Sequence, residues 1–90
     1  MRENFLYEVW ALAYDKQNNL IDDYLVYETT NIFDAELFID SIYDVDDLIN
    51  DGLIDKPRKT AYIEIVLEQF EQIEPGRFDR KIIENKIMEV

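Results

Sequence analysis

Carboxylates recur at helical spacing in the middle of this 90-residue chain. Residues three or four positions apart lie on one face of an α-helix, so a nearly continuous helix would align them. Such a row can coordinate a cation, transfer protons or attract a positively charged partner, and the rest of the sequence decides among these chemistries. The five aligned carboxylates are Glu36, Asp40, Asp44, Asp47 and Asp51.

A calcium loop is the first of these chemistries, and the run Asp44–Gly52 invites it. If a loop begins at Asp47, Gly52 occupies the sixth position, as required. However, the third position is Ile49 and the twelfth is Arg58, where oxygen ligands are needed. The chain also has no His and no Cys, which are the usual ligands of transition metals. We therefore expect no metal site and no cofactor.

Proton transfer is the second chemistry, and the composition argues against it. The commonest general base is missing because the chain has no His, and Ser41, the only serine, has no His to activate it. Paired carboxylates act as acid and base only in a cleft that separates their pKa values, and a chain of 90 residues has little room for one. We predict no catalytic residue and no enzymatic activity.

Attraction of a basic partner is the chemistry that the charge distribution favours. Between Lys16 and Lys56 there are eleven carboxylates and no Lys or Arg, and the whole chain has a net charge of −12. Like charges at i,i+4 each cost a helix about 0.2–0.5 kcal/mol. We interpret the row as a set of anions that imitates a nucleic-acid backbone and binds a protein groove lined with Lys and Arg. The alternative interpretation is an acidic surface that is simply solvated.

The same charges set limits on the partner. Asp22 and Asp34 could extend the field, and they join the five carboxylates as candidate partner-binding residues. A pI near 4.1 argues against direct binding of nucleic acid or of an anionic membrane, because both are bound by Lys and Arg. No apolar run approaches the roughly 18 residues that span a membrane. We expect a soluble, cytoplasmic protein.

Four segments have the composition and alternation of β-strands. The runs 5–15 and 21–29, joined by the polar turn 17–19, predict a β-hairpin. The run 60–73 predicts a third strand, and 78–88 predicts a returning fourth strand, although its apolar spacing also fits a helix. The sequence thus predicts an α+β fold of one domain, residues 1–90, with an antiparallel four-stranded sheet in the order ββααββ and one or two short helices on one face.

The segment between the hairpins has the periodicity of an amphipathic helix. Asn31 or Asp34 can cap its start, and Asp44 with Asp47 three residues later indicates a second start. Gly52 ends the pattern. We expect two short helices or one kinked helix.

The first strand is apolar on both faces, which predicts a central position in the sheet. Ala11 and Ala13 are small enough to let a helix approach one face closely. The other face carries Trp10 and Tyr14, and a second subunit is one candidate to cover it. A homodimeric structural or assembly module that uses this aromatic face is therefore the alternative to an acidic inhibitor.

Two stretches carry a resemblance, YEVWALAYDKQNNLIDDYLVYETTNIFDAELFIDSI and YIEIVLEQFEQIE. They resemble small proteins of phages and mobile elements in low-GC Gram-positive bacteria. Among such proteins are acidic inhibitors of host defence, including anti-CRISPR proteins and anti-restriction DNA mimics. The resemblance implies a non-enzymatic inhibitor that acts in the host cytoplasm on a basic nucleic-acid-binding protein, such as a CRISPR effector. It supplies no residue-level site.

Overall fold

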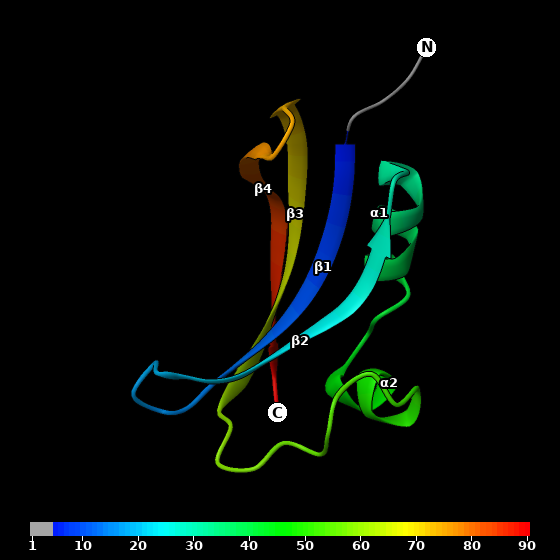
Figure 1. The fold of residues 1–90 in the computed structure, drawn as a ribbon. Coiled ribbons are helices and arrows are strands. Elements are labelled where there is room, and N and C mark those ends of the chain that lie inside the picture. Colours follow the sequence, from blue (N-terminus) through cyan, green and yellow to red (C-terminus); the bar gives the residue numbers. More distant parts are fainter. Residues whose placement is uncertain (1–4) are drawn as a thin grey trace.

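The computed structural model describes residues 5–90, which form four strands and two helices (Figure 1). In chain order these are β1 (Phe5–Tyr14), β2 (Leu20–Thr29), α1 (Ile32–Asp40), α2 (Val45–Asn50), β3 (Tyr62–Glu74) and β4 (Arg77–Glu89). The predicted α+β class and the order ββααββ are confirmed. The segment 78–88 belongs to strand β4, so its helical alternative is wrong.

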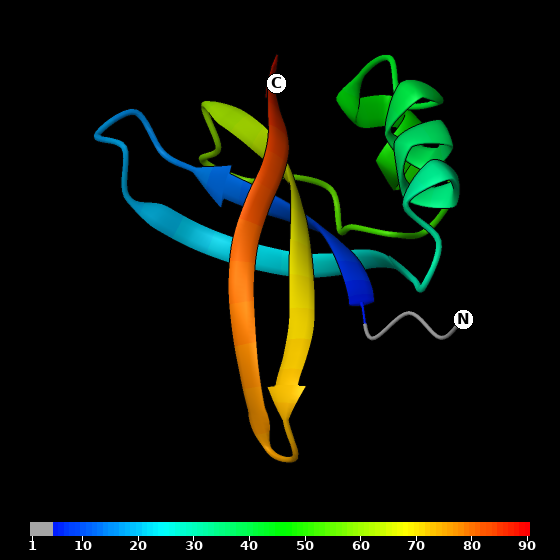
Figure 2. The same cartoon turned by 90° about the horizontal axis from the view of Figure 1, so that it is seen from above.

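The four strands form one antiparallel sheet in the order β2-β1-β3-β4, with β1 central as predicted. Both helices lie on the same side of this sheet, close to β1 and β2 (Figure 1). The tip of the β3–β4 hairpin projects away from the helices (Figure 2). Every residue from 71 to 82 is exposed, so the tip is an arm with solvent on both faces.

The hydrophobic core lies between the helices and one face of the sheet. Val9, Ala11 and Ala13 of β1 are buried there, and each is paired across the ladder with a buried residue of β3. Burying one large apolar side chain stabilises the fold by about 1.5–3 kcal/mol. The largest fully buried side chains are Val9, Leu48, Ile63, Ile65 and Leu67.

Small side chains on β1 allow the helical layer to approach, and an aromatic pair anchors it. Ala35 of α1 is completely buried, and it belongs to the same core as Ala11 and Ala13. Tyr27 of β2 and Phe38 of α1 stack with their ring centroids 4.6 Å apart. Such a pair contributes about 0.5–1.5 kcal/mol beyond the area it buries.

Local signals in the sequence define the ends of both helices. The Asn31 side chain accepts a hydrogen bond from the Phe33 backbone N–H at 2.9 Å, and it thereby caps α1. Gly52 has a φ of +73°, which completes the hydrogen-bonded turn after α2. Ser41 caps the C-terminus of α1, and the chain then becomes extended at Asp44, so the two helices are separate.

The C-terminus of α1 depends on a lysine from the opposite end of the chain. The last turn of α1 contains no basic residue. Lys86 of β4 instead donates from its Nζ to the backbone oxygens of Ile39, at 3.2 Å, and of Ile42. A cation at this end of a helix is favourable because the helix dipole is negative there. Lys86 therefore ties α1 to an edge strand of the sheet.

We predict that Lys86→Met lowers the free energy of unfolding by about 1–2 kcal/mol, because two carbonyl oxygens lose a charged donor. Lys81→Met is the matched control, since Lys81 lies on the same strand, is exposed and makes no hydrogen bond or ion pair with residues 5–90. The control should change stability by less than about 0.5 kcal/mol in urea denaturation. Equal losses in both variants would show that Lys86 acts only through its charge.

Candidate functional site

The predicted carboxylates are divided between two helices. Glu36 and Asp40 lie on α1, and Asp47 lies on α2. Asp44 is the N-cap of α2 and Asp51 is its C-cap. Because the helix is interrupted between residues 41 and 44, the condition of one nearly continuous helix is not met. The five side chains form two short groups rather than a single helical row.

Two of these carboxylates have a structural role. The Asp44 side chain accepts from the Asp47 backbone N–H at 3.1 Å. The Asp47 side chain accepts from the N–H groups of Tyr43, at 2.7 Å, and Asp44, at 3.2 Å. This reciprocal capping box satisfies backbone donors that a helix start would otherwise leave unpaired. The spacing of Asp44 and Asp47 that predicted a helix start is therefore explained by local structure.

The remaining three carboxylates make no hydrogen bond and no ion pair within the described part of the chain. Asp40 is the last residue of α1 and Asp51 caps the end of α2, where the helix dipole disfavours an anion. Glu36 lies one turn before Asp40. These residues stabilise neither helix, so they are available to a partner.

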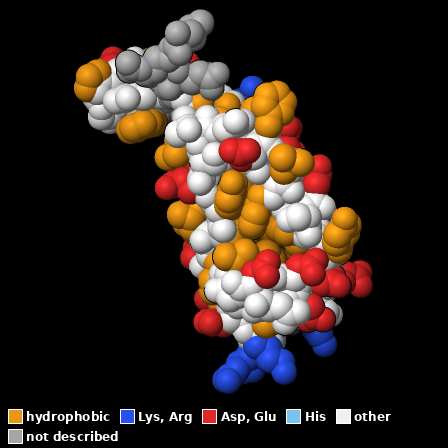
Figure 3. Space-filling model, turned by 90° about the vertical axis from the view of Figure 1, so that its right-hand side faces the viewer, with side chains coloured by type: hydrophobic (Ala, Val, Ile, Leu, Met, Phe, Trp, Pro, Cys, Tyr) orange, Lys and Arg blue, Asp and Glu red, His pale blue; other side chains and the backbone are white. Residues whose placement is uncertain are grey.

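Large apolar side chains lie beside these acids on α1. Phe33 is 70% exposed and Leu37 is 67% exposed. They are four residues apart, and helical geometry places Glu36 and Asp40 beside them. Figure 3 shows this side of the molecule, where hydrophobic and acidic side chains alternate and Lys and Arg gather at the lower end. The sequence analysis missed Phe33 and Leu37, although both are out of phase with the buried Ala35 and Ile39.

The acidic field is not neutralised by ion pairs within residues 5–90. Among residues 5–90 the ion pairs are Arg77 with Glu74, at 3.8 Å, and Arg80 with Glu68, at 3.0 Å. Both lie in the β3–β4 hairpin, so none of the eleven carboxylates between Lys16 and Lys56 takes part in one. Asp34, in the first turn of α1, belongs to this unpaired set and is exposed.

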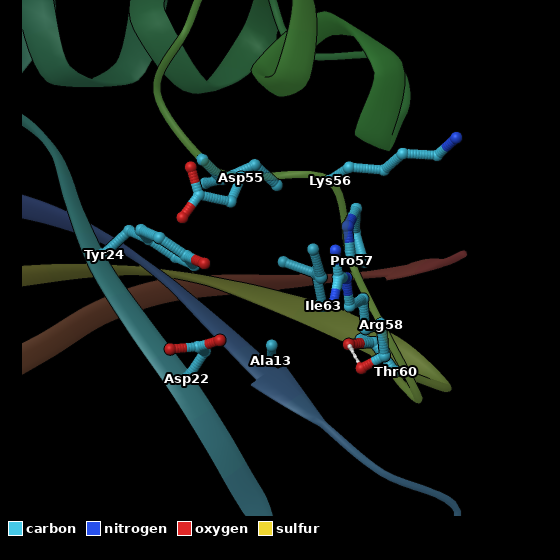
Figure 4. Close-up of a pocket in the computed structure, with 10 residues that line it drawn as sticks. Ala13, Asp22, Tyr24, Asp55, Lys56, Pro57, Arg58, Thr60 and Ile63 are labelled. Carbon is cyan, nitrogen blue, oxygen red and sulfur yellow. Dashed lines mark hydrogen bonds between the residues drawn. The ribbon is translucent and has the colours of Figure 1, made fainter.

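Asp22 lies apart from the helical carboxylates, on β2, where it lines an open cleft of about 610 Å³. In Figure 4 the carboxylates of Asp22 and Asp55 both point toward the Tyr24 ring, whereas the Lys56 side chain extends away from them. Burial first, and then the charges of Asp22 and Asp55, raise the pKa of the Tyr24 phenol.

A second hydroxyl group in this cleft is engaged in a hydrogen bond. Thr60 is the hydroxyl that lines it besides Tyr24, and it donates to the Arg58 carbonyl oxygen at 3.1 Å. Among residues 5–90 no group of three or more acidic side chains is arranged to hold a metal ion. No helix in that part of the chain is long and apolar enough to cross a membrane.

The chain matches no protein-family model, no curated protein and no solved structure. The candidate site therefore depends on the geometry and charge of its own residues.

We predict that Asp22→Asn lowers the pKa of Tyr24 toward the ordinary value of 10.0, because it removes a neighbouring negative charge. Asp23→Asn should leave this pKa unchanged, since Asp23 pairs with Leu12 and points to the opposite face of β2. NMR of ring-labelled tyrosine, recorded across alkaline pH, measures the pKa of Tyr24 in both variants. An equal shift in the two variants would contradict this placement of Asp22.

The raised pKa of Tyr24 also predicts that the protein loses stability at alkaline pH. A raised pKa means that the folded state holds the phenolic proton more tightly than the unfolded state does. The contribution is therefore complete below about pH 10 and is lost as the pH rises through the raised pKa. Tyr24→Phe should remove this part of the pH dependence in denaturation experiments.

Proposed function

We propose that this protein is a non-enzymatic inhibitor whose acidic helical face binds the basic, nucleic-acid-binding groove of a host defence nuclease. A CRISPR effector in the cytoplasm of a low-GC Gram-positive host is the first target to test. We define the acidic helical face as Glu36 and Asp40 on α1 and Asp51 at the end of α2; the further candidate residues are Asp34, Asp44, Asp47 and, on β2, Asp22. The observation that carries the proposal is that these carboxylates have no ion-pair partner within residues 5–90.

The positions of Asp40 and Asp51 support a role in binding rather than in folding. Each is at the C-terminal end of a helix, where a Lys or Arg would stabilise the helix by about 0.3–1 kcal/mol. The acids incur this cost and receive no internal hydrogen bond or ion pair among residues 5–90 in return. A binding partner that supplies cations at these positions would offset it.

The exposed apolar side chains of α1 favour a protein partner. A row of anions alone would attract any cation, including free ions. Phe33 and Leu37 add an apolar ridge next to Glu36 and Asp40, and this ridge can enter a pocket between basic residues. Buried aromatic and aliphatic anchors surrounded by polar contacts are typical of protein–protein interfaces.

We predict that the triple variant Glu36→Lys, Asp40→Lys and Asp51→Lys abolishes binding while the protein stays folded. Two of the new cations lie at helix C-termini, where they are favourable. The control variant Glu71→Lys, Asp79→Lys and Glu89→Lys changes the net charge equally but lies on β3 and β4, and it should retain binding. Pull-down from a low-GC Gram-positive lysate, followed by inhibition assays on the recovered nuclease, measures the difference.

Binding should also weaken steeply with salt, because exposed charges are screened beyond about 8 Å at physiological ionic strength. The recovered protein should be a basic nucleic-acid-binding protein, and nucleic acid should compete with the inhibitor for it. Recovery and inhibition that are the same for the helical triple variant and for the wild type would remove the proposal.

A further inference from the structure

The face of the sheet opposite the helices carries both apolar and acidic side chains, and neither helix of the described residues 5–90 covers it. Along β1 the alternate residues Leu6, Trp10, Leu12 and Tyr14 point to this side and lie outside the buried core. Val66 of β3, which pairs with Trp10, is buried yet also lies outside that core. Antiparallel sheets that face water usually carry polar residues there, so the large apolar side chains on this face need an explanation. We call this surface the open sheet face.

The apolar side chains on its outer strands are large and accessible. Leu20 and Leu25 of β2 are 52% and 45% exposed, and Ile82 and Ile87 of β4 are 61% and 63% exposed. At roughly 200 Å² for a fully exposed large side chain, these four contribute on the order of 400 Å². The partly exposed Trp10 lies between the two edges and adds to this area. Exposed apolar patches of this size are often functional on monomeric proteins.

A row of carboxylates crosses the middle of the open sheet face. Glu28 of β2 pairs with Glu8 of β1, which pairs with Glu68 of β3. Like charges directly opposite each other destabilise a sheet. Arg80 neutralises Glu68, which is only 8% exposed, and Glu8 accepts from the Trp10 indole N–H at 2.9 Å. Glu28 is exposed and makes no hydrogen bond or ion pair within residues 5–90, so the row retains unneutralised negative charge.

We infer that the open sheet face binds a basic amphipathic helix of another protein. The apolar side of the helix would cover Trp10, Leu12 and Leu25, and its Lys or Arg residues would reach Glu28 and Glu8. Three neighbouring strands span about 10 Å, which matches the diameter of a helix with its side chains. The result is a sheet covered by helices on both faces, a common solution for a two-sided apolar sheet.

Charge complementarity selects this occupant over a second copy of the chain. Face-to-face pairing of two copies would bury the Glu28–Glu8–Glu68 rows of both molecules in one apolar interface. Burying carboxylates without partners is costly, and each copy offers only Arg80 from this part of the face. An anionic membrane is disfavoured by the same charges. The inference concerns a different face from the acidic helical face, so it stands or falls independently of the proposed function.

Trp10 makes the inference directly testable, because it is the only tryptophan and lies in the centre of the open sheet face. The probe is a tryptophan-free peptide of about 18 Leu and Lys residues, with Leu along one helical face. Titration should shift the Trp10 emission to shorter wavelength and saturate at one peptide per protein. A peptide with Glu in place of Lys should not bind, and neither should a scrambled Leu and Lys peptide that lacks an apolar face.

Matched variants then locate the binding surface. The double variant Leu25→Ser and Glu28→Lys should weaken peptide binding by roughly tenfold or more, because it removes one apolar and one charged contact. Both residues are exposed on an edge strand, so the fold should survive, as circular dichroism can confirm. Phe33→Ser with Leu37→Ser removes a similar apolar area from α1 and should leave this binding unchanged.

Three outcomes would overturn the inference. Loss of binding in the α1 variant, with retention in the β2 variant, would place the peptide on the helical side. Equal binding of the acidic and basic peptides would show that charge plays no part. Concentration-dependent dimerisation in analytical ultracentrifugation, with the same shift in Trp10 emission and no peptide present, would show that a second copy occupies the face.

Discussion

The sheet carries apolar side chains on both faces, but the helices of the described residues cover only one of them, and the rest of the structure depends on this constraint. The two helices contain few residues, and they cover only the side where Ala11 and Ala13 keep the surface of β1 flat. Within residues 5–90 no helix covers the other side, where the rings of Tyr14 and Tyr62 stack with their centroids 5.1 Å apart. The two faces of the sheet therefore differ in what covers them within residues 5–90.

The helical side shows how the fold accommodates charge that it does not need for stability. The break between α1 and α2 turns Asp44 and Asp47 into a capping box, while Asp40 remains at a helix end that disfavours it. Lys86 offsets this locally by donating to the carbonyl oxygens at the end of α1. The structure thus supplies one cation where the backbone needs it and leaves the surface carboxylates unpaired, which is the arrangement expected if an external partner provides the rest.

Local features of the fold could be predicted from the sequence because they depend on neighbouring residues. The alternation of β1, the Asn31 cap and the turn at Gly52 are of this kind. The contact between Lys86 and the end of α1 joins residues more than 40 positions apart, so no local sequence pattern predicts it. The row of carboxylates on the open sheet face could not be predicted either. Glu28, Glu8 and Glu68 become neighbours only through the registers of β2 and β3 on β1. For the site, the spacing located the acids, but it could not show that two of them cap α2.

The basic residues of the chain argue for a partner other than a second copy. The basic residues of the sequence lie mostly after the acidic stretch, at Lys56, Arg58, Lys59, Arg77, Arg80, Lys81 and Lys86, and such a separation of charge could favour head-to-tail association. In the structure, however, Lys86 is engaged with α1, Arg80 with Glu68 and Arg77 with Glu74. The cations that remain near one another are Lys56, Arg58 and Lys59 of the loop before β3, with Lys16, which lines the same cleft as Lys59. So small a group cannot neutralise eleven carboxylates on a neighbouring copy. A protein that binds the acidic surfaces would therefore have to supply most of the cations itself.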